Sequence, residues 1–194
     1  MPAILITPPA TEPITLAEAK DHLRILDAAQ DTLIGAMIKG ARQYIETHLG
    51  RSLVTQTWEL ALDAWPEKGF VRILNPPVIS ITSVTAVQSG VVVTLDPIAY
   101  QSDLVSRIPR LAPAANASWP SADVGVLNAI RVRYTAGYGA AAAVPEDIKA
   151  AIKFILAHWF ENREATVVGT ISSELANSVA MILTEHRIRP VDWE

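Results

Sequence analysis

Apolar residues recur at helical spacing over residues 144–164, VPEDIKAAIKFILAHWFENRE. The positions of the apolar stripe lie four and three residues apart: Ile148, Ile152, Ile155 and Trp159. Pro145 suits a first helical turn, because its missing N–H has no intrahelical partner there. The pattern predicts one long amphipathic helix whose stripe packs against other helices.

Two earlier helices are predicted from their end signals. Thr15 and Glu18 have the spacing of a capping box, in which each side chain accepts a hydrogen bond from the other residue's backbone N–H. Asp31 is the predicted N-cap of a second helix over residues 32–49. Gly50 follows where a left-handed C-cap is expected. The two helices are therefore expected to be antiparallel neighbours with a tight connection.

Residues 54–143 show the alternation and composition of strands instead. The expected strands are 55–63, 70–74, 78–88, 91–95 and 129–134, with a weaker candidate at 100–108. Residues 111–125 are rich in Pro, Ala and Ser and are predicted to form a surface loop. A small antiparallel β unit is expected.

The predicted fold class is therefore α+β and mainly α: a helical bundle with a small antiparallel β-domain inserted between helix 2 and helix 3. The bundle is discontinuous, with residues 15–53 and 144–186, and residues 54–143 form the insertion. Residues 1–14 are expected to be an extended N-terminal arm, and residues 187–194 a C-terminal tail.

The bundle is expected to include a last helix from Ser172 or Ser173 through His186. The predicted core of the bundle comprises Leu23, Leu26, Ile34, Ile38, Ile45, Ile152, Ile155, Trp159 and Val179. The predicted core of the β unit comprises Trp58, Leu60, Val84 and Val132.

The composition limits the function classes. Of 194 residues, 50% are hydrophobic and only 19% charged, which suggests that an assembly buries surface exposed in one copy. The net charge of −4 argues against dedicated nucleic-acid binding. The absence of cysteine excludes disulfides, thiolate catalysis and cysteine-based zinc sites. Because there is neither a signal-peptide pattern nor an apolar run of ~20 residues, we expect a soluble intracellular chain with no membrane partner.

No motif indicates catalysis. The histidines stand singly on predicted helices: His22, His48, His158 and His186. Metal-ligand spacing, a P-loop, a dinucleotide-binding motif and a nucleophile elbow are all absent from the sequence. We expect no catalytic residue, cofactor or metal. An enzyme with an undetected site in the β unit is one alternative, and it requires a pocket with paired carboxylates or a histidine–carboxylate couple.

Two groups of side chains are candidates for contacts. Arginines on the β unit form a modest basic group that we interpret as solvated surface: Arg107, Arg110, Arg131 and Arg133. The tail carries Arg187, Arg189, Pro190 and Trp193. Tryptophan and arginine dominate binding hot spots, so the tail is either a frayed end or an anchor for a partner.

An ordered set of short segments spans residues 16–164. It comprises LAEAK at 16–20, HLR at 22–24, YIE at 44–46, LGRSL at 49–53, QTWEL at 56–60, LD at 62–63, WP at 65–66, YTAGYG at 134–139, VP at 144–145 and WFENRE at 159–164. In this set the chain resembles the phage head–tail connector (adaptor) proteins of the gp6-like and gp8-like families.

The resemblance implies a helical bundle with a β insertion and a non-enzymatic role. Copies would form a ring, usually of twelve, on the portal protein of a tailed phage, a prophage or a gene-transfer particle. The ring would extend the DNA channel and dock a stopper or tail-completion protein, while DNA passes without sequence-specific binding. It would lie at the head–tail interface of the virion, after assembly in the bacterial host cytoplasm.

In related adaptors the C-terminal segment contacts the portal. The resemblance therefore assigns portal binding to four tail residues as a hypothesis: Arg187, Arg189, Pro190 and Trp193.

The second alternative is a DNA-binding packaging or regulatory protein that uses the first helix pair. A recognition helix should be basic, yet residues 32–49 carry only Lys39 and Arg42, opposed by Glu46.

Overall fold

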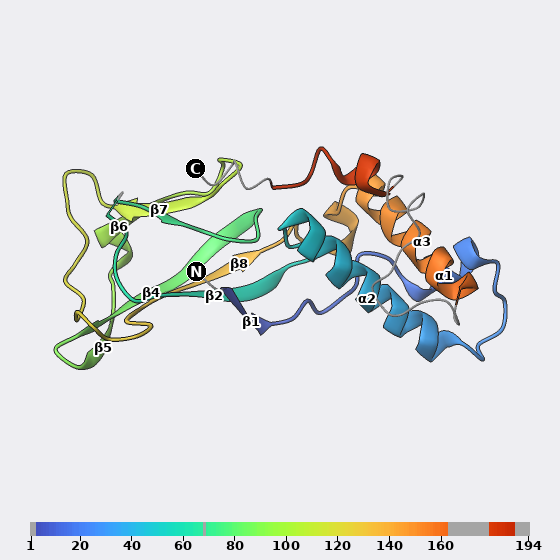
Figure 1. The fold of residues 1–194 in the computed structure, drawn as a ribbon, viewed down its shortest axis with the longest axis horizontal. Helices are drawn as coiled ribbons and strands as arrows, with labels where there is room; N and C mark the ends of the chain where they lie inside the picture. The colour runs from blue at the N-terminus through green and yellow to red at the C-terminus, as the bar shows by residue number, and fades with distance from the viewer. Residues whose placement is uncertain (1–2, 68, 163–178, 189–194) are drawn as a thin grey trace. The chain divides into compact units, whose positions relative to one another are not determined.

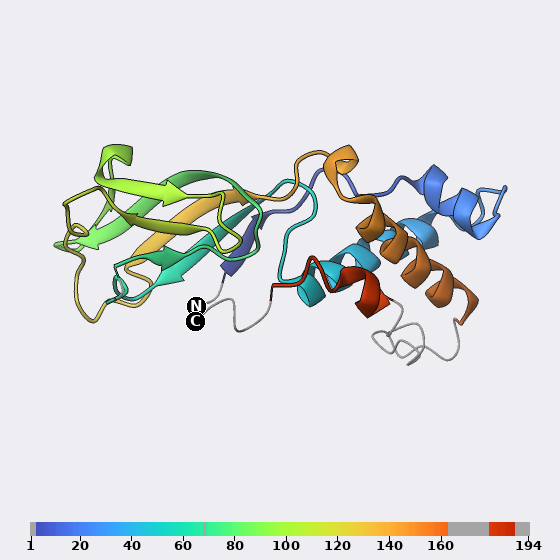
Figure 2. The same ribbon diagram turned by 90° about the horizontal axis from the view of Figure 1, so that it is seen from above.

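The computed structural model describes residues 3–67, 69–162 and 179–188. The described residues divide into two compact units (Figures 1 and 2). The helical unit takes the described residues 11–54, 139–162 and 179–188, and the β unit takes residues 3–10, 55–67 and 69–138. Within these residues, no helix has both the length and the apolar character needed to span a bilayer.

The helical unit contains α1 (Leu16–Leu23), α2 (Asp31–Leu49) and α3 (Glu146–Glu161), which contact one another pairwise. A short 3-10 turn, η2 (Ala141–Ala143), precedes α3, and residues 179–183 are again helical. The side chains buried at their common core are Ile34, Ile38, Ile45, Ile148, Ile152, Ile155, Leu156, Val179 and Leu183. The predicted α3 stripe is buried at its first three positions and half-buried at the fourth.

Gly40 explains how Trp159 fits at the α2–α3 contact. A Cβ on Gly40 would lie 3.3 Å from the indole ring of Trp159, which is tighter than ordinary packing allows. Tyr44, one turn further along α2, meets the same indole edge-on at 6.5 Å between ring centroids. A Cβ at position 40 would therefore push the Trp159 ring away by a few tenths of an ångström.

Local sequence signals set the ends of the helices. The capping box is confirmed: the Thr15 N–H donates to Glu18 at 2.7 Å and the Glu18 N–H donates to the Thr15 hydroxyl at 3.1 Å. Gly50 caps α2 with φ of 64°, as predicted. Asp31, however, is the first residue of α2 and Gln30 is its N-cap. The Asp31 carboxylate accepts from Lys20 Nζ at 2.7 Å instead of capping the helix.

The prediction that Leu26 is a core residue is wrong. Helix α1 ends at Leu23, and Arg24 takes a left-handed conformation with φ of 57°. The chain turns away from the helical register at that point, so Leu26 is 97% exposed.

The β unit contains two antiparallel sheets. The five-stranded sheet has the order β1 (Ala3–Thr7), β2 (Gln56–Leu62), β8 (Ile130–Ala136), β4 (Val78–Gln88) and β5 (Val91–Thr94). The three-stranded sheet has the order β3 (Val71–Arg72), β7 (Arg110–Pro113) and β6 (Tyr100–Asp103), and η1 (Pro97–Ala99) precedes β6. Residues 3–7, where we expected an extended arm, pair with β2 at the edge of the larger sheet.

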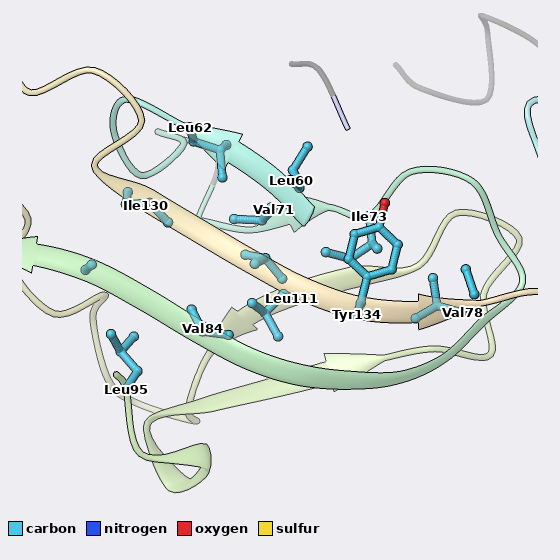
Figure 3. Packing of buried hydrophobic residues seen from close by; sticks show 13 residues of the cluster. Leu60, Leu62, Val71, Ile73, Val78, Val84, Leu95, Leu111, Ile130 and Tyr134 are labelled. Carbon is cyan, nitrogen blue, oxygen red and sulfur yellow. The ribbon is translucent and has the colours of Figure 1, made fainter. Parts of the chain in front are cut away.

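The two sheets share one core (Figure 3). The larger sheet contributes Leu60, Leu62, Val78, Val84, Ala86, Ile130, Val132, Tyr134 and Ala136, with Leu95 directly after β5. The smaller sheet contributes Val71 and Leu111, with Ile73 directly after β3. Trp58 packs against this cluster and is half-buried.

The predicted fold class, mainly α, is wrong. Strands make up 26% of the structure and form two antiparallel sheets. The sequence underestimated the sheets because β3, β6 and β7 have only two to four residues, too few to show alternation. One of them, β7, extends through residues 111–113 into the stretch predicted to be a loop. The first part of the last predicted helix, residues 172–178, lies outside the described residues, and its described part is helical over residues 179–183.

Candidate interaction surfaces

No metal centre is found in the part of the chain that the structure describes. The histidines lie in structural contacts instead: His22 against Phe154, His48 stacked on Tyr44, His158 beside Asn162 and His186 beside Asp147. The contact of His186 is a histidine–carboxylate couple, but it lies in the helical unit and links the C-terminal segment to the first turn of α3.

The C-terminal segment is seated on the helical unit up to residue 188. The Ile188 N–H donates to the Leu49 carbonyl at the end of α2 at 2.9 Å, and Arg51 Nε donates to the His186 carbonyl. His186 Nε2 lies 2.6 Å from Asp147 Oδ2, and the Ile188 side chain is buried. The point from which the tail departs is therefore fixed.

Among the four tail residues proposed for portal binding, only Arg187 lies in the described chain. Its side chain is exposed at this point of departure. Burial lowers the pKa of the nearby His48, and the charge of Arg187 lowers it further. Arg189, Pro190 and Trp193 lie outside the described residues.

The four arginines of the predicted basic group lie at two separate positions, one on each sheet of the β unit. Arg131 and Arg133, on β8, both pair with Glu59 on β2, at 3.1 and 2.6 Å. Glu59 is only 8% exposed. The sequence analysis missed this carboxylate, because its pairing depends on the β2–β8 register that places Glu59 opposite Arg133. Two of the four arginines thus share one carboxylate on the larger sheet.

The second group of arginines lies on the smaller sheet. Arg72 and Arg110 lie over the ring of Phe70, at 5.7 and 5.9 Å from its centroid. Arg107 lines the same groove as these three side chains. Asp103 Oδ2 accepts from Arg110 Nε at 3.1 Å. We call Phe70, Arg72, Arg107 and Arg110 the arginine groove.

Asp103 is expected to titrate far below an ordinary aspartate. Hydrogen bonds from the Ser106 hydroxyl and N–H, and then from Arg110, lower its pKa from 3.8 to about 2. Because the folded pKa is depressed, the contribution of the Asp103 carboxylate to stability is present above pH 3.8 and is lost as the pH falls toward 2.

A carboxyl NMR titration of Asp103 should show a midpoint near 2. Ser106→Ala should raise it toward 3.8, whereas Ser102→Ala should not, and equal midpoints in all three proteins would contradict this cause.

Helix α2 offers little basic surface. Arg42 is only 3% exposed and pairs with Glu12 at 2.6 Å and with Glu46 at 2.5 Å. Lys39 remains exposed on this helix. The feature required by the DNA-binding alternative, a basic recognition helix, is therefore not present on α2.

The edge strands of the five-stranded sheet are apolar and exposed. The exposed side chains are Ile4, Leu5 and Ile6 on β1, and Val91, Val92 and Val93 on β5. The loop beside the β4–β5 turn adds Val124 and Leu127 and is held there by Asp123, which accepts from the Ser89 and Gly90 N–H groups. Open apolar edges are surfaces that a protein assembly can bury.

The described residues thus offer two kinds of surface for protein contacts: apolar edge strands and a C-terminal segment held on the helical unit. The profile of the head completion protein family matches residues 12–188, and the chain belongs to that family. It is thus a structural head–tail connector protein of a phage-like particle, which confirms the resemblance seen in the sequence.

Solved structures show the same fold. A chain from the neck of an empty gene transfer agent particle, computed with C6 symmetry, is 23% identical with a TM-score of 0.81, and 97% of each chain is covered. A chain from the virion of the native particle gives 23% and 0.80 at the same coverage. A chain from the native neck computed with C12 symmetry gives 24% and 0.74, again at 97% coverage. A comparison with curated proteins finds no match.

Proposed function

We propose that twelve copies of the chain form a ring on the portal protein, extend the DNA channel and dock a stopper or tail-completion protein. The observation that carries the proposal is that similarly folded chains come from particle necks computed with C6 and C12 symmetry. The role is non-enzymatic, and its place is the head–tail interface of a particle assembled in the host cytoplasm.

Surface chemistry supports an assembled state. The apolar edges β1 and β5 and the low share of charged residues, 19%, suit a subunit with lateral interfaces.

Electron microscopy of the chain with its portal protein tests the proposal. We expect a ring with a central channel about as wide as duplex DNA. A chain that stays monomeric and ignores the portal would refute it.

The tail is proposed to bind the portal. Because Ile188 is buried and hydrogen-bonded to Leu49, removing residues 187–194 would also disturb the helical unit. A sharper deletion removes only residues 189–194. We expect it to abolish co-sedimentation with portal while the melting temperature stays unchanged, and Trp193→Ala should weaken docking in the same assay.

An internal control uses Ile188→Ala in the full-length chain. This variant should lower the melting temperature of the helical unit, because it truncates a buried side chain. If the chain without residues 189–194 docks as well as the full chain, the portal contact lies elsewhere.

A further inference from the structure

The outer face of the five-stranded sheet is covered by short polar side chains. Residues directly opposite in an antiparallel pair share one face, and each strand alternates between its two faces, so the positions between the core residues of Figure 3 point outward. The hydroxyl-bearing residues at these positions are Thr57, Ser80, Ser83, Thr85, Thr94 and Thr135. With Glu59, Arg131 and Arg133, we call them the outer sheet face.

A buried carboxylate holds two arginines at the centre of the outer sheet face. Glu59 Oε1 accepts from Arg131 Nη1 at 3.1 Å, and Glu59 Oε2 accepts from Arg133 Nε and Nη2 at 3.1 and 2.6 Å. Glu59 is only 8% exposed, whereas the side chains of Arg131 and Arg133 are 55% and 44% exposed. The five strands contain no lysine and no aspartate. Because two guanidinium groups share one carboxylate, this face presents positive charge to the solvent.

These side chains suit a protein interface. Association costs free energy when it fixes long, flexible side chains, and interfaces are accordingly rich in arginine and poor in lysine. Glu59 already fixes the two guanidinium groups, and serine and threonine have few rotamers to lose. A guanidinium group has five N–H donors, so each arginine keeps donors that Glu59 does not use. A carboxylate from a partner would accept from them.

We propose that the outer sheet face binds exposed carboxylates of a neighbouring copy of this chain. Charge complementarity selects this partner, because the chain has a net charge of −4. Its helical unit carries exposed carboxylates, among them Asp21, Asp27 and Glu161.

The charge of the face also selects the symmetry of the contact. Pairing of the face with itself about a twofold axis would bring arginines of the two copies together, and like charges in an interface are unfavourable. The contact is therefore head-to-tail, with different surfaces on the two copies, and such contacts close into rings. The inference rests on the proposed ring and specifies a surface that joins its subunits.

The first test compares Thr94→Glu with Thr94→Lys in ring assembly on the portal protein, followed by sedimentation. Thr94 is exposed and lies in one row across the sheet with Thr85 and Arg131. The two new side chains are of similar length and opposite charge. We expect Thr94→Glu to raise the chain concentration for half-maximal assembly roughly 10-fold, and Thr94→Lys to leave it unchanged or lower it. The difference should shrink between about 50 and 500 mM salt, because salt screens charge.

Arg131→Gln is a second variant for the same assay. It removes a charge from the centre of the face, while Arg133 still pairs with Glu59. We expect assembly to weaken by a similar factor and the melting temperature to stay nearly unchanged. The matched control is Lys39→Gln, which removes the same charge from an exposed position of α2 and should assemble like the unaltered chain.

A zero-length carbodiimide cross-link identifies the partner. The amine introduced by Thr94→Lys should couple to a carboxylate of a neighbouring copy in the assembled ring. Mixing isotope-labelled and unlabelled chains lets mass spectrometry separate links between copies from links within one copy. Coupling to a portal carboxylate instead would overturn the inference and assign the face to the portal.

The remaining outcomes separate this inference from the proposed function. Equal weakening by Thr94→Glu and Thr94→Lys, or unchanged assembly of Thr94→Glu and Arg131→Gln, overturns the inference and leaves the ring standing. A charge effect at Thr94 that disappears after nuclease treatment also overturns it, in favour of DNA. If no ring forms on the portal but the free chain associates through this face, the proposed function alone fails. If neither association occurs, both fail.

Discussion

Replacing Arg42 by leucine is expected to lower the free energy of unfolding of the helical unit by about 3–5 kcal/mol. The guanidinium group is 3% exposed and lies between Glu12 and Glu46. Removing it leaves two carboxylates facing an apolar side chain without their counter-ion. Glu46 also accepts from the Leu53 N–H at 2.9 Å, so the loss reaches the segment that follows α2. Urea titration followed through the amide NMR signals of α2 measures the change.

The matched control is Lys39→Leu, which makes the same charge change at an exposed position of the same helix. Surface substitutions of this kind usually alter stability by within ~0.5 kcal/mol. Equal destabilisation by both variants would show that helix charge, and not the buried ion cluster, is responsible. Arg42→Lys should fall between them, because a lysine keeps the charge but lacks the two-sided donor geometry.

Sequence signals that act within one turn predicted the structure well. Thr15 with Glu18 and Gly50 fixed helix ends through groups a few residues apart, and the spacing of Ile148, Ile152 and Ile155 identified a buried stripe. Leu26 shows the limit of periodicity. The left-handed turn at Arg24 ends the helix, and the hydrophobic pattern alone does not contain that information.

Features that depend on partners distant in the chain were not predictable in this way. Strand β3 has two residues and exists because it pairs with β7. The burial of Glu59 between two arginines follows from the β2–β8 register. These missing long-range pairings also explain why the fold class was judged mainly helical.

The same distinction between local sequence signals and long-range pairings applies to the candidate surfaces. The tail was recognised from its residue types and from the family resemblance, but its seat depends on the hydrogen bond from Ile188 to Leu49, which are far apart in sequence. Only part of the arginine groove could be predicted from the sequence. Arg107 and Arg110 were noted, whereas Arg72 and Phe70 joined them through the β3–β7 pairing.

Replacing Tyr134 by alanine is expected to destabilise the β unit by about 3–5 kcal/mol, as large aromatic truncations in cores do. Tyr134 lies on the central strand β8, opposite Trp58 on β2 and Ile81 on β4, and is fully buried (Figure 3). Truncation would leave a cavity at the centre of the larger sheet. Urea titration followed through the amide signals of β8 and β2 measures the loss.

Tyr134→Phe separates the ring from the hydroxyl group. Burial raises the pKa of this phenol, and within the described residues its hydroxyl has no hydrogen-bond partner. A buried hydroxyl without a partner costs about 1–3 kcal/mol. The phenylalanine variant should therefore be as stable as the unaltered chain or more stable. Destabilisation by more than ~1 kcal/mol would contradict this and would show that the hydroxyl contributes a hydrogen bond to the folded β unit.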